Sequence, residues 1–343
     1  MGSPITGLRN SPKSVSVKFK AKKIANTVIE DKALHKPVFL IGLSVTVLAI
    51  FFALNFTNTL FGEFLRPVIG DPTESGFFGR FAVSLVLTII FVLNLFVISF
   101  ARLKVQILIV WVELLLLFLA FAYSFDLKMS FIQGRIGLMI SRGLFTTIYI
   151  SAVSIVIATV IAVIGAIAKL SNNGFAYAIS SFYTSLFRGL PLLLQLFLIY
   201  KGLPQLGFMV DAVPAAITAL SLCYGAYMTE IFRAGIQSIP KGQWEASRAL
   251  GFKFNLILRK IILPQAIPII IPPTGNQFIA MLKDSSLASV LGVWELMYLA
   301  RTLGQRDFRH MEMLLTAAMI YWALTIVLEI IQARIEEKYK QKS

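Results

Sequence analysis

Lys283 and Asp284 lie side by side near the end of a long apolar run, and Ser285 and Ser286 follow them directly. Ionisable side chains at membrane depth are costly and are therefore functional candidates. An ammonium, a carboxylate and two hydroxyls can together match a ligand that carries both charges, as an amino acid does. The alternative is an ion pair that only locks helix packing, and the sequence leaves both roles open.

Two amides precede this pair in the same run. Asn276 and Lys283 are seven residues apart, as are Gln277 and Asp284, so each pair shares one helix face. Prolines recur every four residues before them, at Pro264, Pro268 and Pro272. A helix with such prolines leaves backbone carbonyls unpaired, which is tolerated where they face protein or a water-filled path. The pattern predicts a helix that lines a polar path.

Arg188 and Gln195 are also seven residues apart, at the start of the apolar run 190–208. Arg188 could contact a substrate or anchor the inner membrane boundary, whereas the deeper Gln195 favours a cavity-facing role. Glu230 and Arg233, near the inner end of a later run, are interpreted as a structural or gating pair.

The composition shows what kind of element must position these residues. Of 343 residues, 57% are hydrophobic and only 14% are charged, and the mean hydropathy is +0.79. Soluble domains average about 25% charged residues, so a soluble fold is excluded. A lone cysteine and two distant histidines exclude a disulfide framework, a histidine metal site and a Ser-His active site.

Eight membrane crossings are expected, each long enough to span about 30 Å of hydrocarbon. They lie at roughly 38–61, 81–100, 105–124, 145–169, 190–208, 213–234, 266–288 and 312–333. The runs are continuously apolar and lack a ten-residue alternation, which favours helices over a barrel. The predicted fold is an all-α membrane protein.

Lysine and arginine predict the orientation. Residues 1–37 hold eight basic residues against two acidic ones, and an even number of crossings places both termini in the cytoplasm. Nucleic-acid binding by this arm is not favoured, because the arm directly abuts a membrane span. The last outer loop fits the rule poorly, since it carries Arg301, Arg306 and Arg309.

The inner loop 236–264 is long and has a helical pattern of its own. Ser238 and Pro240 are predicted as helix cap and first-turn proline, and Gly251 as the left-handed residue that ends the helix. A second helix follows from about Asn255, with a bend at Pro264. The loop is expected to form a helix-bend-helix knob that docks into a partner, although a surface helix lying on lipid is the alternative.

Four ordered motifs in this part of the chain resemble the polar amino-acid uptake family of ABC importer permeases. Glu245-Ala246-Ser247, then Gly251, then Leu263-Pro264 match the spacing of the EAA loop, with Ser in place of Ala at the third position. The other motifs are residues 187–196, residues 230–244, and residues 275–278 together with 282–287. The resemblance implies a five-helix type I permease core over 140–335 that contains the loop 236–264. Residues 1–37 are then a basic arm, 38–139 a three-helix extension and 336–343 a tail.

The resemblance also implies partners. The loop would supply a coupling helix to a separate ABC ATPase dimer through residues Trp244, Glu245, Ala246, Ser247, Arg248, Leu250 and Gly251. Glu245 is expected to pair with a basic group, and Trp244 and Leu250 to anchor the contact. The sequence has no Gly-x-x-x-x-Gly-Lys-Ser/Thr loop, so ATP and Mg²⁺ are expected in the ATPase and no cofactor in this chain.

A second permease subunit, an extracytoplasmic amino-acid-binding protein and the bilayer of a bacterial inner membrane complete the expected assembly. A secondary transporter or a channel subunit is the alternative. A secondary transporter would more often show two related halves, and a channel a filter or charged ring; neither pattern stands out. No catalytic constellation is visible, which favours a transport subunit over an enzyme.

Overall fold

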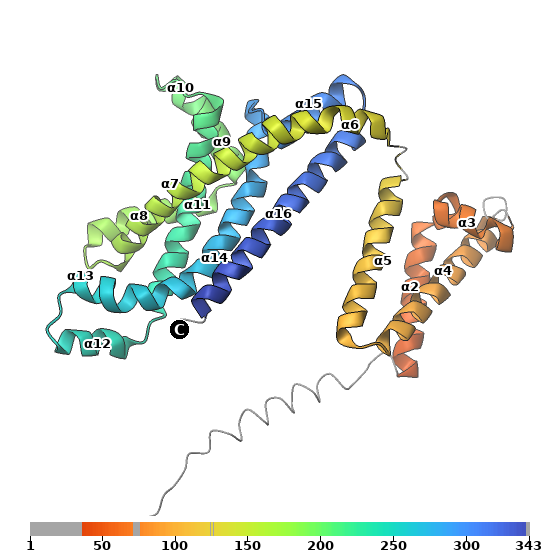
Figure 1. The fold of residues 1–343 in the computed structure, drawn as a ribbon, viewed down its shortest axis with the longest axis horizontal. Helices are drawn as coiled ribbons and strands as arrows, with labels where there is room; N and C mark the ends of the chain where they lie inside the picture. Colours follow the sequence, from red (N-terminus) through yellow and green to blue (C-terminus); the bar gives the residue numbers. More distant parts are fainter. Residues whose placement is uncertain (1–35, 71–75, 124, 126, 341–343) are drawn as a thin grey trace, which may run out of the picture. The chain divides into compact units, whose positions relative to one another are not determined.

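The structure is a computed structural model that describes residues 36–70, 76–123, 125 and 127–340, and it divides the chain into two compact units (Figure 1). The units are Met1–Phe125 and Asp126–Ser343. The described residues are helical and contain no strand, which confirms the all-α prediction. The basic arm is almost wholly outside the described residues.

The first unit is built on three long apolar helices: α2 (Pro37–Leu54), α4 (Gly76–Ser99) and α5 (Leu103–Tyr123). Their length and hydropathy suit membrane crossings, as the sequence predicted. A short helix, α3 (Leu60–Ile69), lies between α2 and α4 in the chain. Arg80 of α4 donates hydrogen bonds to the carbonyls of Phe52 and Ala53 at 2.5 and 3.0 Å, which satisfies the carboxyl end of α2.

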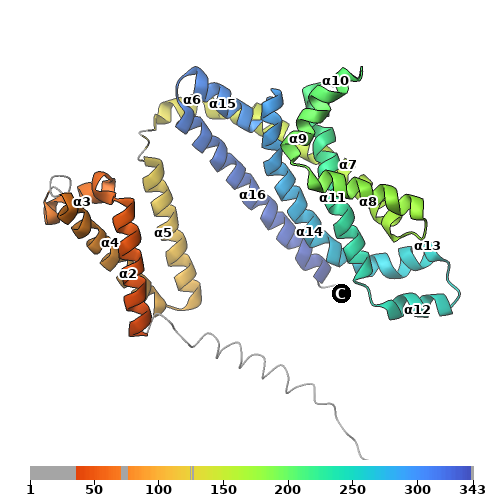
Figure 2. The ribbon, with the colours of Figure 1, turned by 180° about the vertical axis from the view of Figure 1, so that it is seen from behind.

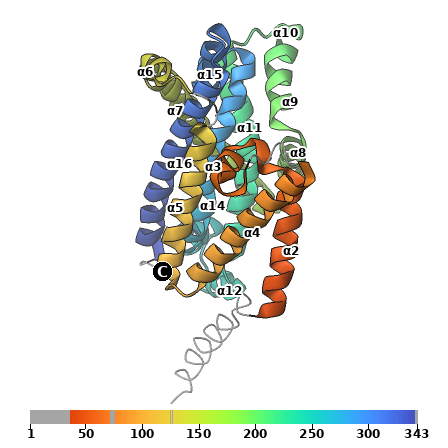
Figure 3. The same cartoon turned by 90° about the vertical axis from the view of Figure 1, so that its right-hand side faces the viewer.

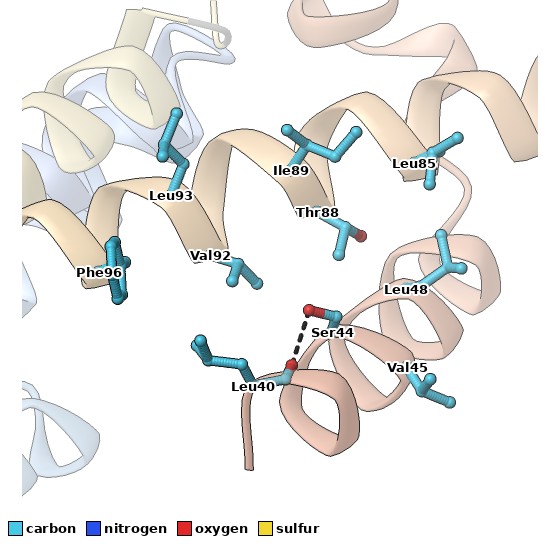
Figure 4. Close-up of a pocket in the computed structure, with 10 residues that line it drawn as sticks. All are labelled: Leu40, Ser44, Val45, Leu48, Leu85, Thr88, Ile89, Val92, Leu93 and Phe96. Carbon is cyan, nitrogen blue, oxygen red and sulfur yellow. Dashed lines mark hydrogen bonds between the residues drawn. The ribbon is translucent and has the colours of Figure 1, made fainter. Parts of the chain in front are cut away.

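Two polar side chains of the first unit, Ser44 and Glu113, have hydrogen-bond partners within that unit. A groove of about 390 Å³ between α2 and α4 is lined almost wholly by apolar side chains (Figure 4). Its Ser44 hydroxyl donates to the carbonyl of Leu40 at 2.8 Å, so that hydroxyl has its partner in its own helix (Figure 4). Glu113, in the middle of α5, accepts a hydrogen bond of 2.9 Å from the Asn94 amide of α4. This hydrogen bond joins α5 to α4.

The second unit begins at Asp126, ahead of the permease core that the resemblance implied over 140–335. It includes α6 (Met129–Leu138), which packs against α16 (His310–Lys340). A π-helical turn, η3 (Met139–Leu144), then joins α6 to α7 (Phe145–Leu170), and helical structure continues from Met129 to Leu170.

The centre of the second unit is the long contact between α7 and α11 (Ala212–Gln237). Small residues let the two backbones approach closely: Ala158 and Ala162 of α7 are fully buried. A Cβ atom added at Gly165 would lie 2.6 Å from the Thr229 hydroxyl oxygen. The small-residue stripe is therefore a packing surface.

The fifth predicted crossing is wrong in detail. Residues 170–189 were expected to be an inner loop, but they contain α8 (Gly174–Gly189), whose first turn is capped by the Asn173 side chain. A bend of 106° separates α8 from the following helical run of α9 (Leu192–Phe197), η4 (Leu198–Gly202) and α10 (Leu203–Gln205). The break falls at Leu190-Pro191, because the residue before proline disfavours the helical conformation.

α14 (Leu263–Asp284) packs between α11 and α16 (Figures 2 and 3). It is preceded by α12 (Lys241–Ala249), α13 (Phe254–Ile257) and η5 (Leu258–Ile262), and followed by η6 (Ser285–Leu291) and α15 (Leu296–Arg306). α12 and α13 lie at one end of this unit and α6 and α15 at the other (Figure 1). Seven helices of the described chain can span a membrane, or eight if the bent pair counts as one span.

Candidate functional site

A cavity of about 390 Å³ opens where α8, α11 and α14 meet. Its polar lining consists of Arg188 at the end of α8, Tyr224 and Tyr227 of α11, and Gln277 and Asp284 of α14. Arg188 and Asp284 are opposite in charge, and both lie on the wall of one cavity. The arrangement can bind a small molecule that carries an anionic group and a cationic group.

Two contacts fix the charged side chains of the cavity. The Tyr224 hydroxyl donates to Asp284 Oδ2 at 2.7 Å. The guanidinium carbon of Arg188 lies 5.4 Å from the centre of the Tyr227 ring, which is a cation–π contact. Each charge is therefore held by a tyrosine of α11, and neither is neutralised by the other.

The polar residues of α14 divide as the two seven-residue pairs do. Gln277 and Asp284 line the cavity, whereas Asn276 and Lys283 do not. Asn276 Oδ1 accepts a 3.0 Å hydrogen bond from the Gln332 amide of α16. The predicted Lys283–Asp284 cluster is thus divided between the cavity and another face.

Three other predicted residues, Gln195, Ser285 and Ser286, lie outside the cavity lining. Gln195 is buried, and its amide donates to the carbonyls of Phe187 and Leu190 at 2.8 and 2.9 Å, on the α8 side of the helix break. The buried Ser285 hydroxyl donates to the Leu282 carbonyl at 2.7 Å, and Ser286 is half-buried. None of the three lines the cavity.

Tyr224 and Tyr227 were not identified from the sequence. A signal was present, because they are two aromatic residues three positions apart, separated by the small residues Gly225 and Ala226. Such spacing places both rings on neighbouring positions of one helix face.

Glu230 and Arg233 form an ion pair, as the sequence predicted, with Arg233 Nε 2.8 Å from Glu230 Oε2. The Lys169 ammonium at the end of α7 binds the other oxygen of the same carboxylate. Arg233 also donates to Gln237 Oε1 at 2.5 Å. The cluster ties α7 to α11 near α12, and Lys169 is a member that sequence reasoning missed.

The loop after α11 forms the expected helices, with one correction. Pro240, and not Ser238, precedes the first residue of α12, and the Ser238 hydroxyl instead donates to the Gly235 carbonyl at the end of α11. Gly251 has φ +76°, which confirms the predicted left-handed residue. The chain changes direction between η5 and α14, where a bend at Pro264 was expected (Figures 1 and 2).

The side chains of α12 divide into an inner and an outer set. Trp244 stacks on Phe254 at 6.2 Å and packs against the apolar cluster beneath the loop, and Ser247 is buried. Leu250 is 72% exposed. Glu245, Ala246 and Arg248 are also exposed. The structure therefore assigns Trp244 to the inner packing of the loop, where the sequence had expected an anchor for a partner.

A buried carboxyl group at the far end of the unit was also missed. Glu295 is fully buried and caps α15, accepting hydrogen bonds from the backbone amides of Met297 and Tyr298 at 2.9 and 2.6 Å. The Tyr321 hydroxyl of α16 donates to it at 2.8 Å. Burial raises the pKa of Glu295 to about 7, although these hydrogen bonds act in the opposite direction.

Comparison with known proteins identifies the family. The family described as "Binding-protein-dependent transport system inner membrane component" matches residues 161–341, which is more than half of the chain. The chain belongs to this family. The match lies within the second unit. It confirms the resemblance to ABC importer permeases that the four sequence motifs indicated.

Two curated relatives come from Bacillus subtilis (strain 168). The chain is 40% identical to the arginine transport system permease protein ArtQ over 202 residues, covering 59% of this chain and 92% of ArtQ. It is 38% identical to the L-cystine transport system permease protein TcyB over 208 residues, covering 60% and 89%.

Solved structures show the same fold. An amino acid ABC transporter crystallised with histidines is 34% identical, with a TM-score of 0.59 over 62% of this chain and 99% of that chain. The MetNI methionine ABC transporter in an inward-facing form is 22% identical, with a TM-score of 0.53 over 59% and 96%. The second unit therefore has the type I ABC permease fold.

Proposed function

We propose that this chain is the transmembrane permease subunit of an ATP-driven importer of polar amino acids, and that the cavity between α8, α11 and α14 is its substrate pathway. The observation that carries the proposal is the pair of opposite charges, Arg188 and Asp284, on the wall of one cavity. An α-amino acid carries a carboxylate and an ammonium on one carbon, so both charges find a partner. The names of the relatives, which transport arginine and L-cystine, agree with this substrate class.

The proposal gives each lining group a role. Arg188 receives the substrate carboxylate and Asp284 the ammonium, while Gln277 and the tyrosine hydroxyls contact the substrate side chain. The Tyr224 hydrogen bond keeps the Asp284 carboxylate in place. Because the cavity lies beside the break between α8 and α9, a change in that bend alters access to it.

The exposed side chains of α12 are the proposed contact with the ATPase dimer. Glu245 offers a charge and Leu250 an apolar anchor, and both extend from a helix whose inner face is held by Trp244. The ATPase subunits would hold ATP and Mg²⁺. ATP can drive the permease only through the difference in docking free energy between two ATPase states.

The proposed assembly contains a second permease subunit and an extracytoplasmic amino-acid-binding protein, in a bacterial inner membrane with both termini in the cytoplasm. No nucleic-acid partner is expected. In this orientation α12 faces the cytoplasm and α15 the outside.

The test is uptake of a panel of labelled amino acids by the complete complex in liposomes. Asp284→Asn and Arg188→Gln should each lower uptake at limiting substrate at least about tenfold, because each leaves one substrate charge without its partner. Glu329→Gln and Arg334→Gln change the same groups on the exposed surface of α16 and serve as matched controls. Uptake unchanged by both cavity variants, for every amino acid tested, would place the pathway elsewhere.

A further inference from the structure

α15 presents a polar face of one charge sign on the side opposite its buried residues. Its buried side includes Leu296, Leu299, Ala300, Leu303 and Gly304, at the spacing of one helix face. The exposed positions 301, 302, 305 and 306 occupy the opposite face, and they are Arg, Thr, Gln and Arg. This face therefore carries two cations and no acid.

Two cations at this end of the unit, Arg309 and Arg135, have acidic partners, whereas among the described residues Arg301 and Arg306 have none. Arg309 is paired with Glu312 at 3.0 Å, and Arg135 lies 3.5 Å from Asp307. Asp307 is the one acidic residue between 296 and 309. Among the described residues, Arg301 and Arg306 form no ion pair with an acid of their own chain.

An exposed aromatic residue follows this face directly. Phe308 is 87% exposed and has φ +53°, a left-handed conformation that is unfavourable for a bulky residue. The turn is held by Arg309, whose amide donates to the Gly304 carbonyl at 2.8 Å, and a Cβ at Gly304 would lie 3.0 Å from His310 Cα. The fold thus exposes a phenylalanine ring two residues after Arg306.

The position of this surface makes its charge unexpected. α15 lies at the end of the unit opposite α12 (Figure 1). In the proposed orientation, the end that carries α15 is on the extracytoplasmic side of the membrane. The positive-inside rule disfavours arginine near the outer ends of membrane helices, so two unpaired arginines here call for an external anionic partner. Arginine and large aromatic residues are also the types that contribute most to protein–protein binding.

We propose that Arg301, Gln305, Arg306 and Phe308 form an outer docking surface that binds an acidic face of the extracytoplasmic binding protein. The inference rests on the proposed function and adds the residues and the charge of the contact. The arginines steer and hold the acidic face, and the Phe308 ring packs into an apolar depression at its centre. The phenyl ring that is exposed in the isolated subunit becomes buried in the docked complex.

The test measures binding between the complete complex in phosphatidylcholine nanodiscs and the binding protein that supports wild-type uptake. Arg301→Glu combined with Arg306→Glu should weaken affinity at least about tenfold at about 50 mM NaCl, and the loss should shrink at about 300 mM because salt screens the contact. Arg334→Glu with Lys338→Glu, two exposed positions of α16, is the matched charge control.

Phe308→Gly separates docking from folding. Glycine accepts the left-handed backbone without strain, so the variant should unfold at the wild-type temperature or above it while its affinity for the binding protein falls about tenfold. Unchanged affinity in both variants would overturn the docking surface even if wild-type uptake upholds the proposed function. The docking surface would also be overturned if the double arginine variant lowered the affinity only in nanodiscs that contain phosphatidylglycerol, because the arginines would then bind lipid. Absence of uptake by the wild type would instead contradict the proposed function.

Discussion

At the scale of single residues, the cavity keeps two opposite charges unpaired because a different tyrosine holds each of them. Asp284 and Arg188 do not pair with each other, because Tyr224 holds the first by a hydrogen bond and Tyr227 the second by its ring. The sequence predicted Asp284, Gln277 and Arg188, since polar residues in apolar runs stand out. It could not exclude Lys283 from the cavity, because helix rotation is fixed by packing between α14 and its neighbours and not by spacing alone.

Glu295 gives a residue-scale prediction about pH. Its pKa is raised from an ordinary value of 4.5 to about 7, so the folded protein keeps a proton that the unfolded chain releases. Stability from this group is fully present below about pH 4.5 and is lost as pH rises to about 7, with a slope of up to about 1.4 kcal/mol per pH unit. Glu295→Gln cannot titrate. We therefore expect the unfolding temperature of the variant, relative to wild type, to rise between pH 5 and pH 8.

Thermal unfolding of both proteins in the same detergent at the two pH values checks this expectation. Taking the difference between the proteins removes the contribution of other titrating groups. Parallel curves, with a constant gap between variant and wild type, would show that Glu295 does not hold its proton in the fold.

At the scale of elements, the break between α8 and α9 is the feature that hydropathy reading missed. A continuous apolar run after Leu190 indicates one straight crossing. In the structure Asn173 caps a separate helix, α8, and Pro191 lies at the bend that separates α8 from α9. Both signals are local, and the apolar run concealed them. The EAA loop was predicted better, because Gly251 marks a backbone requirement that few other residues meet.

Gln195→Leu tests how the break is held. The Gln195 amide binds two backbone carbonyls near the break, and leucine of similar size leaves them without these partners. Loss of two buried hydrogen bonds should cost about 2–3 kcal/mol, seen as a lower unfolding temperature in detergent. Gln305→Leu, on the exposed face of α15, is the matched control for the loss of an amide. Equal stability of the two variants would show that the break does not depend on Gln195.

At the scale of the whole molecule, the composition and the apolar runs predicted the fold class and nearly all crossings. They did so because a bilayer permits few architectures. The start of the second unit differs from the expected start of the core at residue 140. α6 belongs to this unit because it packs against η3 and α16, and no local sequence pattern indicates such long-range packing. The family match within 161–341 and the position of α12 at one end of the same unit support one account, in which the loop after α11 transmits movement from an ATPase to the cavity.

Co-purification of the ATPase with the permease, together with ATP-dependent uptake by the same preparation, tests that central claim most directly. Glu245→Lys combined with Leu250→Asp changes only exposed side chains of the loop. The account predicts at least a tenfold loss of bound ATPase and of uptake, about 1.4 kcal/mol or more in docking, with an unchanged unfolding temperature of the permease. A double variant that retains the full complement of ATPase and transports at the wild-type rate would contradict it.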